Sequence, residues 1–315
     1  MPRSAAPAAW NTSASWKCTL VTLDSLLLGF QSIFASGLVL ASLYVLMAAG
    51  LALVWNTLGI FNFTHGALMA VAAYVAWTVA DPRGLDLGLA VGVIVAILVA
   101  ALLGLVINYL LVAPFLGQKQ IVLIAVMTTL SGAFFIENSA LLIWGPRIKQ
   151  LDKFVEGNVK IAGTTISGHE AVIIVVAPLL MLGLWAFLRF TWTGSAIRAV
   201  AQNREFAELS GIRVKRMYAI AFAIAAALAG FAGIMLGAIR FITPGLGGEP
   251  LLKALIVVIL GGLGSMPGTV LGAYLVGFGE AISTYFLGAY WTQAMLFLVF
   301  IAFLVLRPNG LLGKP

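Results

Sequence analysis

Long apolar runs separated by short polar connections set the pattern of this 315-residue chain. Most of the runs have about the 20 residues that an α-helix needs to cross ~30 Å of hydrocarbon. They lack the short alternating segments that are typical of a membrane β-barrel. The pattern therefore predicts an all-α, polytopic integral membrane protein with about eight to nine transmembrane or re-entrant helices. The expected helices span 32–55, 60–80, 88–112, 121–144, 171–190, 217–239, 251–263, 268–287 and 290–306.

The apolar run 251–263 is too short to cross a bilayer, and it leads directly into "GGLGSMPG". We predict a broken or re-entrant helix here, which a bilayer tolerates only where protein or a water-filled cavity covers it. A second interruption, "NTLGIFNFTHG" at 56–66, lies in the first half of the chain. One interruption in each half suggests an inverted repeat.

Composition supports the membrane interpretation and excludes several other classes. Hydrophobic residues make up 62% of the chain and charged residues 9%, whereas about a quarter of a soluble domain is charged. The polar connections are shorter than the ~50 residues of a small catalytic domain. The sequence contains no GxxxxGK[ST], HExxH or GxSxG motif, so a P-loop ATPase, a zincin and a serine hydrolase are not expected. We expect no metal site and no cofactor.

The net charge of +7 predicts topology rather than nucleic-acid binding, because Lys and Arg gather in cytoplasmic loops. The connection 189–216 carries an excess of basic residues, and the tail 307–315 is also basic, so both are expected in the cytoplasm. The nearly balanced connection 145–170 then faces outward. Residues 1–30 are predicted to form a tail with a short interfacial helix, and 31–306 a single transmembrane domain. The charges of the large connection are Arg189, Arg198, Arg204, Arg213, Lys215 and Arg216 against Glu205 and Glu208.

A few polar side chains lie within the predicted spans, where an ionised group costs roughly 2.5–3.5 kcal/mol on insertion scales. We assign these residues to a candidate translocation pathway. Structural alternatives exist: an interhelical hydrogen bond for His65, a helix cap for Thr64, and an ion pair for Glu137. The candidate pathway residues are Asn62, Thr64, His65, Glu137, Asn138 and Glu280.

The stretch "TGSAIRAVAQNREFAELSGIRVKRM" in the large connection predicts one short amphipathic helix or a helical pair. Ser195 is the candidate N-cap, and Gly211 is the candidate C′ residue. A structured element with an apolar stripe, placed between two spans, suggests docking to a partner. The candidate docking residues are Arg204, Glu205, Ala207, Glu208, Leu209 and Gly211.

Three segments together resemble one family of permeases. "GIFNFTHGALMAVAAYV", the large connection with the span after it, and "GGLGSMPGTVLGAYLVGFGEA" are similar to segments of the LivH branch of the LivH/LivM family, the branched-chain amino acid ABC transporter permeases. The ending "RPNGLLGKP" resembles the family's terminus. The chain departs from the family pattern at Thr64, where Ala is usual, and at Glu137, where Gln commonly precedes Asn.

The resemblance implies a permease subunit of an ABC importer in the bacterial inner (cytoplasmic) membrane, without an ATPase site of its own. The implied partners are two ATP-binding cassette subunits, a second permease of the LivM type or a second copy of this chain, and a periplasmic solute-binding protein. The connection 191–216 would then couple the permease to the ATPases. Few intramembrane charges favour a neutral or zwitterionic solute, with branched-chain or other neutral amino acids first.

Other functions stay open on the sequence. The same architecture also transports urea, short amides or small carboxylates. An ion-coupled secondary transporter needs coupling-ion residues near the midplane, a role for which Glu137, Glu280 and His65 are available. An intramembrane enzyme using His65 and Glu137 lacks any nucleophile or metal motif. Co-purification of ATPase subunits would separate these alternatives.

Overall fold

The computed structural model describes residues 23–81, 84–161 and 163–313, and the side chains from residue 29 onward. Within them the chain forms eleven α-helices, a two-stranded antiparallel hairpin and two short π- and 3-10 turns. The α-helices are α1 Leu23–Leu58, α2 Thr64–Ala80, α3 Leu89–Ile107, α4 Ile121–Trp144, α5 Gly168–Phe190, α6 Trp192–Gln202, α7 Arg204–Leu209, α8 Val214–Ile239, α9 Gly248–Gly261, α10 Met266–Leu287 and α11 Ala289–Leu306. The strands are β1 Asn158–Ile161 and β2 Thr164–Ser167, and the turns are η1 Asn108–Val112 and η2 Ala113–Phe115.

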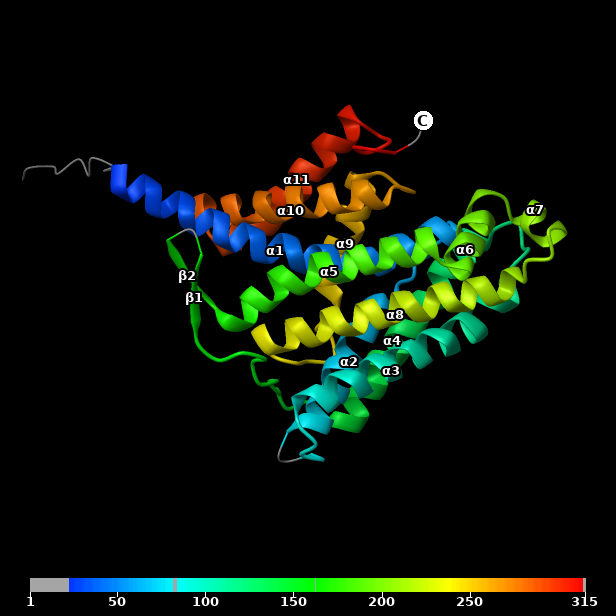
Figure 1. The fold of residues 1–315 in the computed structure, drawn as a ribbon, viewed down its shortest axis with the longest axis horizontal. Helices are drawn as coiled ribbons and strands as arrows, with labels where there is room; N and C mark the ends of the chain where they lie inside the picture. Colours follow the sequence, from blue (N-terminus) through cyan, green and yellow to red (C-terminus); the bar gives the residue numbers. More distant parts are fainter. Residues whose placement is uncertain (1–22, 82–83, 162, 314–315) are drawn as a thin grey trace, which may run out of the picture.

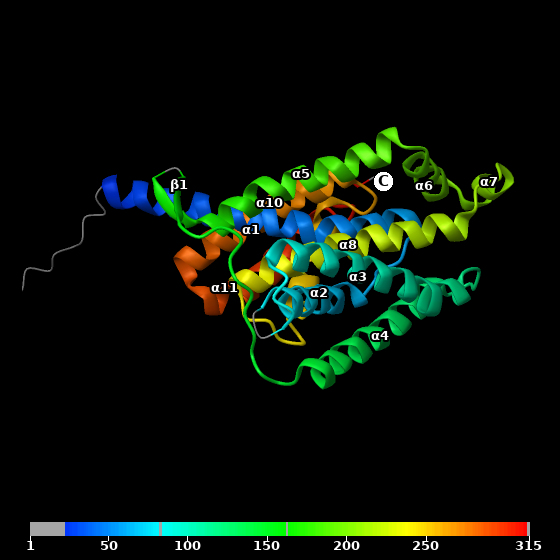
Figure 2. The same ribbon diagram turned by 60° about the horizontal axis from the view of Figure 1, so that its bottom comes forward.

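The long helices lie side by side in one bundle with two distinct ends (Figure 1). The hairpin β1–β2 and the first turns of α1 lie at one end, which we call the hairpin end. Helices α6 and α7 lie at the opposite end, which we call the α6–α7 end (Figures 1 and 2). Seven helices of the described residues are long and apolar enough to cross a membrane. The chain is thus a multi-pass membrane protein, as its sequence predicts.

Each expected span corresponds to a helix, but two of these helices are short. Helix α9 has 14 residues, which confirms the predicted short segment in the second half. Helix α2 has only 17 residues and begins at Thr64, so the expected full span over 60–80 is wrong at its start. The reason is local: Gly59 has a φ of +69°, which ends α1, and residues 60–63 form an irregular connection instead of a first helical turn.

Helix α1 is 36 residues long and runs without interruption from residue 23. The described part of the expected interfacial helix, 23–30, is therefore continuous with the first span and is not a separate element. The rest of that expected tail, residues 1–22, lies outside the described residues. Residues 23–28 contain no Gly or Pro that would break the helix.

The two short helices begin next to each other inside the bundle. Helix α1 runs to the α6–α7 end, and α2 then starts part-way back and continues to the hairpin end. Helix α8 runs the opposite way, and α9 starts part-way back and continues to the α6–α7 end (Figure 1). The triplets α1–α2–α3 and α8–α9–α10 thus have opposite directions, which is the arrangement of an inverted repeat.

The core is built around α1, α2 and α8, while other helices face outward. In its most apolar window α1 is 89% buried, whereas α4 is 17% and α11 is 11% buried. Glycines let the central backbones touch: a Cβ on Gly233 of α8 would lie 2.1 Å from the carbonyl oxygen of Met69 in α2. Such small residues are the usual means of close helix packing in lipid.

Candidate functional site

The interruption before α2 is held by its own polar residues. The side-chain oxygen of Asn62 accepts hydrogen bonds from the Thr64 amide at 3.1 Å and from the Thr64 hydroxyl at 2.6 Å. The amide of Phe63 donates to the Thr129 hydroxyl of α4 at 3.2 Å. A helix cap was the structural alternative for Thr64, but the Thr64 side chain does not cap α2; Asn62 instead accepts the hydrogen bond of the buried Thr64 amide. The connection thereby satisfies backbone groups that no water would reach.

His65 ties the start of α2 to α1. Its Nε2 lies 3.0 Å from the Met47 carbonyl oxygen, so Nε2–H is the donor. The side chain is fully buried and lies against Gly50, where a Cβ would be 2.8 Å from Cε1 of the ring. The interhelical hydrogen bond considered for His65 is therefore present. A role in a solute path for Asn62, Thr64 and His65 stays a prediction.

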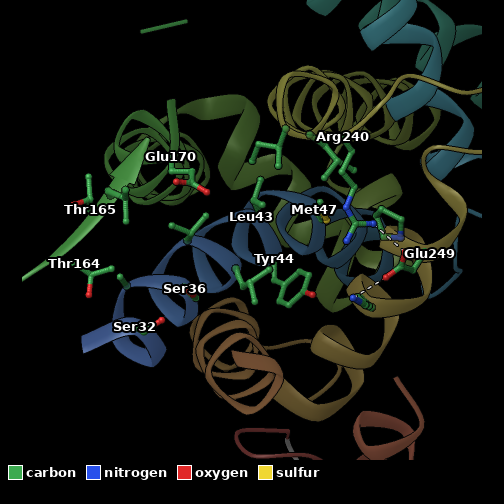
Figure 3. A pocket seen from close by; sticks show the side chains of 18 residues that line it. Ser32, Ser36, Leu43, Tyr44, Met47, Thr164, Thr165, Glu170, Arg240 and Glu249 are labelled. Carbon is green, nitrogen blue, oxygen red and sulfur yellow. Dashed lines mark hydrogen bonds and ion pairs between the residues drawn. The ribbon is translucent and has the colours of Figure 1, made fainter. Parts of the chain in front are cut away.

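A cavity of ≈ 460 Å³ lies between α1, β2, α5, α8 and α9, toward the hairpin end of the bundle. Figure 3 shows Ser32, Ser36 and Thr164 on one side of the cavity, and Tyr44, Arg240 and Glu249 on the other. Its walls are aliphatic. The apolar lining residues are Ala35, Val39, Leu40, Leu43, Met47, Ile166, Leu236, Ile239 and Pro250.

Four charged residues form a connected cluster, and three of them, Arg240, Glu249 and Lys253, line this cavity. Arg240 and Glu249 pair at 2.9 Å, and Lys253 pairs with Glu249 at 2.8 Å. Lys253 also contacts Glu280 at 2.7 Å, and the Tyr44 hydroxyl donates to the same carboxylate. The cluster links α1, α8, α9 and α10, and its formal charges sum to zero.

Only Glu280 of this cluster was among the predicted pathway residues. The structure brings it together with Tyr44, Arg240, Glu249 and Lys253, which the sequence analysis missed. A usable signal was present, since Glu249 and Lys253 are four residues apart at the start of the segment predicted to be re-entrant. Charges there require partners or a polar cavity because lipid cannot solvate them.

Glu137 and Asn138 lie on α4, apart from the cluster. Both side chains are partly exposed on the surface of the chain, and the Asn138 amide donates to the Phe134 carbonyl of the same helix at 2.7 Å. Within the described residues Glu137 has no ion-pair partner. The expected pathway residues are thus divided between three places: the interruption before α2, the charged cluster and the face of α4.

The large connection forms a helical pair, one of the two predicted forms. Thr191 caps α6 by accepting from the Gly194 amide at 2.9 Å, and Asn203 caps α7 by accepting from the Phe206 amide at 3.1 Å. Ser195 was expected as the N-cap, but it lies inside α6 because the helix already begins at Trp192. Two caps in a short stretch fix the angle between the helices.

Gly211 ends α7 as predicted. Its φ is +80°, its amide donates to the Glu208 carbonyl at 3.0 Å, and the Ile212 amide donates to the Ala207 carbonyl at 3.0 Å. These are the two hydrogen bonds of a Schellman motif, in which the C′ residue adopts the left-handed conformation that glycine favours.

The outer face of α7 differs from the predicted docking set at two positions. Ala207 is only 4% exposed, so it packs inside the chain and does not face a partner. Phe206 was not predicted, yet it is 69% exposed, beside Leu209 at 83%. Arg204 and Glu208 pair at 3.1 Å on the surface. The face that α7 presents is therefore Phe206 and Leu209 with a charged margin.

Comparison with known proteins decides the family. A family described as "Branched-chain amino acid transport system / permease component" matches residues 33–304. The chain belongs to this permease family. The permease protein LivH of Escherichia coli is 32% identical over 89% of this chain and 94% of its own length. BraD of Pseudomonas aeruginosa, also a branched-chain amino acid permease protein, gives the same three values.

Permeases named for other solutes also match this chain. The autoinducer 2 import system permease protein LsrC of Enterobacter is 30% identical over 91% of this chain and 82% of its own length. The matches to LivH and BraD confirm the resemblance to the LivH branch across nearly the whole chain. The solute of an individual member has to be argued from its own residues.

Proposed function

We propose that this permease is the membrane subunit of an ABC importer that moves branched-chain or other neutral amino acids into the bacterial cytoplasm. Two ATP-binding cassette subunits would hydrolyse the ATP, and a periplasmic binding protein would deliver the solute. A second permease, of the LivM type or a second copy of this chain, would complete the pore in the inner membrane. The names of LivH and BraD support the solute class.

The helical pair α6–α7 is the observation that carries this proposal. It is capped at both helix starts and closed by Gly211, so it holds a fixed shape. Phe206 and Leu209 face outward, as expected of an anchor that enters a cleft on another protein. A rigid element is needed here, because a flexible loop would absorb the movement of the ATPases before it reached the spans.

The charges of the connection support its cytoplasmic position. The α6–α7 end carries the basic residues of the connection 189–216. The described C-terminal segment returns to the same end, where the Leu312 amide donates to the Gly261 carbonyl at 3.1 Å. The positive-inside rule places that end in the cytoplasm. The cavity at the hairpin end then opens toward the periplasm, from which the solute arrives.

Reconstitution tests the function. Proteoliposomes that contain this chain, its ATPases, the second permease and the binding protein should take up radiolabelled leucine when ATP is supplied on the ATPase side. Liposomes with this chain alone should take up none, since its sequence has no phosphate-binding loop. Uptake by the chain alone, driven by an ion gradient, would support a secondary transporter instead.

Variants of α7 test the coupling surface. We expect Phe206→Ala and Leu209→Ala to leave the permease folded but to weaken retention of the ATPases on affinity purification. Phe241→Ala is the matched control, because Phe241 is 60% exposed and lies at the hairpin end. Equal loss of ATPases in Phe206→Ala and Phe241→Ala would exclude α7 as the docking element.

A further inference from the structure

The charged cluster beside the cavity has an accessible half and a buried half. The side chains of Arg240 and Glu249 are 47% and 39% exposed, and both line the cavity. Lys253 and Glu280 are only 9% and 10% exposed. Figure 3 shows the Arg240 and Glu249 side chains pointing toward each other. A molecule in the cavity therefore meets the Arg240–Glu249 pair first.

We propose that this cavity is a binding site within the permease for the zwitterionic head group of an α-amino acid, held between Arg240 and Glu249. The carboxylate of the ligand would bind the Arg240 guanidinium, and its ammonium would bind the Glu249 carboxylate. This inference rests on the proposed function and adds the residues that recognise the solute after it leaves the binding protein.

Charge balance favours a zwitterion over an anion or a cation. The cluster contains two cations and two carboxylates, so a neutral ligand enters without leaving an unpaired charge in a poorly solvated place. Such a ligand replaces one ion pair, at 2.9 Å, by two. An anion would satisfy Arg240 but leave Glu249 with an excess of negative neighbours, and a cation would do the reverse.

Lys253 keeps Glu249 in place when the pair opens. It contacts Glu249 at 2.8 Å and Glu280 at 2.7 Å, and the Tyr44 hydroxyl donates to Glu280. Glu249 thus retains a cation partner after Arg240 turns to the ligand. Glu170, the other carboxylate on the cavity wall, accepts from the Ser167 amide at 2.8 Å and is committed to capping α5.

The walls of the cavity match an aliphatic side chain. Leu43, Met47 and Ile239 line it together with other apolar residues, and its volume of ≈ 460 Å³ is ample for a molecule the size of leucine. Apolar walls with a few convergent polar groups are the usual composition of small-molecule sites. The Met47 carbonyl also accepts the hydrogen bond of His65, so the cavity floor adjoins the interruption before α2.

Direct binding tests the site. The full-length chain in lipid nanodiscs should bind radiolabelled L-leucine, with competition by L-isoleucine and L-valine. Two analogues that each lack one charged group should compete at least tenfold more weakly: 4-methylpentanoate, without the ammonium, and 3-methylbutylamine, without the carboxylate. A contact with a charged group is worth that much or more. Absence of leucine binding, or equal competition by either analogue, would overturn the proposal.

A double-mutant cycle separates ligand recognition from a structural ion pair. Arg240→Gln and Glu249→Gln should each weaken leucine binding at least tenfold, and the double variant should bind no better than either single variant. If the pair only stabilises the fold, removal of both partners restores binding toward the unsubstituted level, and the proposal fails. Arg147→Gln and Glu156→Gln, exposed charges outside the cavity, are the matched controls and should bind normally.

The assembled transporter distinguishes this proposal from the proposed function. With the partners present, Arg240→Gln should raise the leucine concentration needed for half-maximal uptake while ATPase retention stays unchanged. Leucine uptake that is normal in both cavity variants would contradict the site and leave the importer intact. Absence of leucine uptake by the unsubstituted assembly would contradict the importer's solute class instead.

Discussion

Gly66 and Gly247 touch backbone to backbone where α2 and α9 begin. A Cβ built on Gly247 would lie 1.9 Å from the Gly66 carbonyl oxygen, and one built on Gly66 would lie 2.5 Å from the Gly247 carbonyl oxygen. The two short helices of the inverted repeat thus meet at a point where there is no room for a side chain larger than the hydrogen atom of glycine. This contact sets the depth at which both helices start.

We expect Gly247→Ala to destabilise the protein by at least ~1–3 kcal/mol, because the added methyl group forces the two backbones apart. Gly248→Ala is the matched control, since a Cβ there meets no atom within 4 Å and alanine is a better helix former than glycine. Thermal unfolding of the detergent-solubilised chain measures both. Equal melting temperatures for the two variants would show that the helices do not meet at this point.

Removal of one partner of the buried Lys253–Glu280 ion pair should destabilise the protein more than removal of both. Lys253→Met leaves the Glu280 carboxylate, 10% exposed, with the Tyr44 hydroxyl but without its cation, a loss of ~3–5 kcal/mol. Lys253→Met combined with Glu280→Gln should recover part of that loss, because no unpaired charge is left. Melting temperatures of Lys253→Met, Glu280→Gln and the double variant check this, and a double variant that is the least stable of the three would contradict it.

The sequence predicts the fold of this chain well because lipid imposes strong rules. Each predicted apolar run forms a helix, and the short run before "GGLGSMPG" forms the short helix α9. The same rules could not show that Arg240 and Glu249 meet, since their pairing depends on where the connection 240–247 places the start of α9 relative to the end of α8. Ala207 shows the limit at the level of one side chain: a six-residue helix gives too little periodicity to tell its buried face from its exposed one.

Substitution of His65 should lower the stability of the protein. His65→Ala removes the hydrogen bond to the Met47 carbonyl, at 3.0 Å, and leaves space in a fully buried site. We expect a loss of at least ~0.6 kcal/mol, the average for such bonds in lipid, and more from the cavity. His65→Gln keeps a donor and should recover part of it. A His65→Ala variant that melts normally but does not transport would place His65 in the solute path.

Gly211 tests whether the shape of the α6–α7 pair matters for coupling. Its φ of +80° is unfavourable for a side chain with a branched Cβ, so Gly211→Val should strain the Schellman turn by about 1–2 kcal/mol. The spans should still fold, since a Cβ there meets no atom within 4 Å. We expect ATP hydrolysis by the assembled transporter to lose its dependence on solute-loaded binding protein. Normal stimulation in Gly211→Val would show that this turn is not needed.

Glu137 gives the sharpest test of the predicted pathway residues on α4. Its carboxylate is partly exposed on a helix that is only 17% buried, and exposure to lipid would cost roughly 2.5–3.5 kcal/mol for an ionised group. The second permease or a water-filled path must therefore cover it if it is charged in the assembly. Glu137→Gln keeps the shape of the side chain and removes its charge. It should therefore leave expression and melting temperature unchanged or higher while altering the rate of leucine uptake.

Glu156→Gln, in the connection between α4 and β1, is the control for loss of one carboxylate. Uptake by Glu137→Gln and Glu137→Ala at the unsubstituted rate, with matched amounts of protein in the membrane, would remove Glu137 from the pathway.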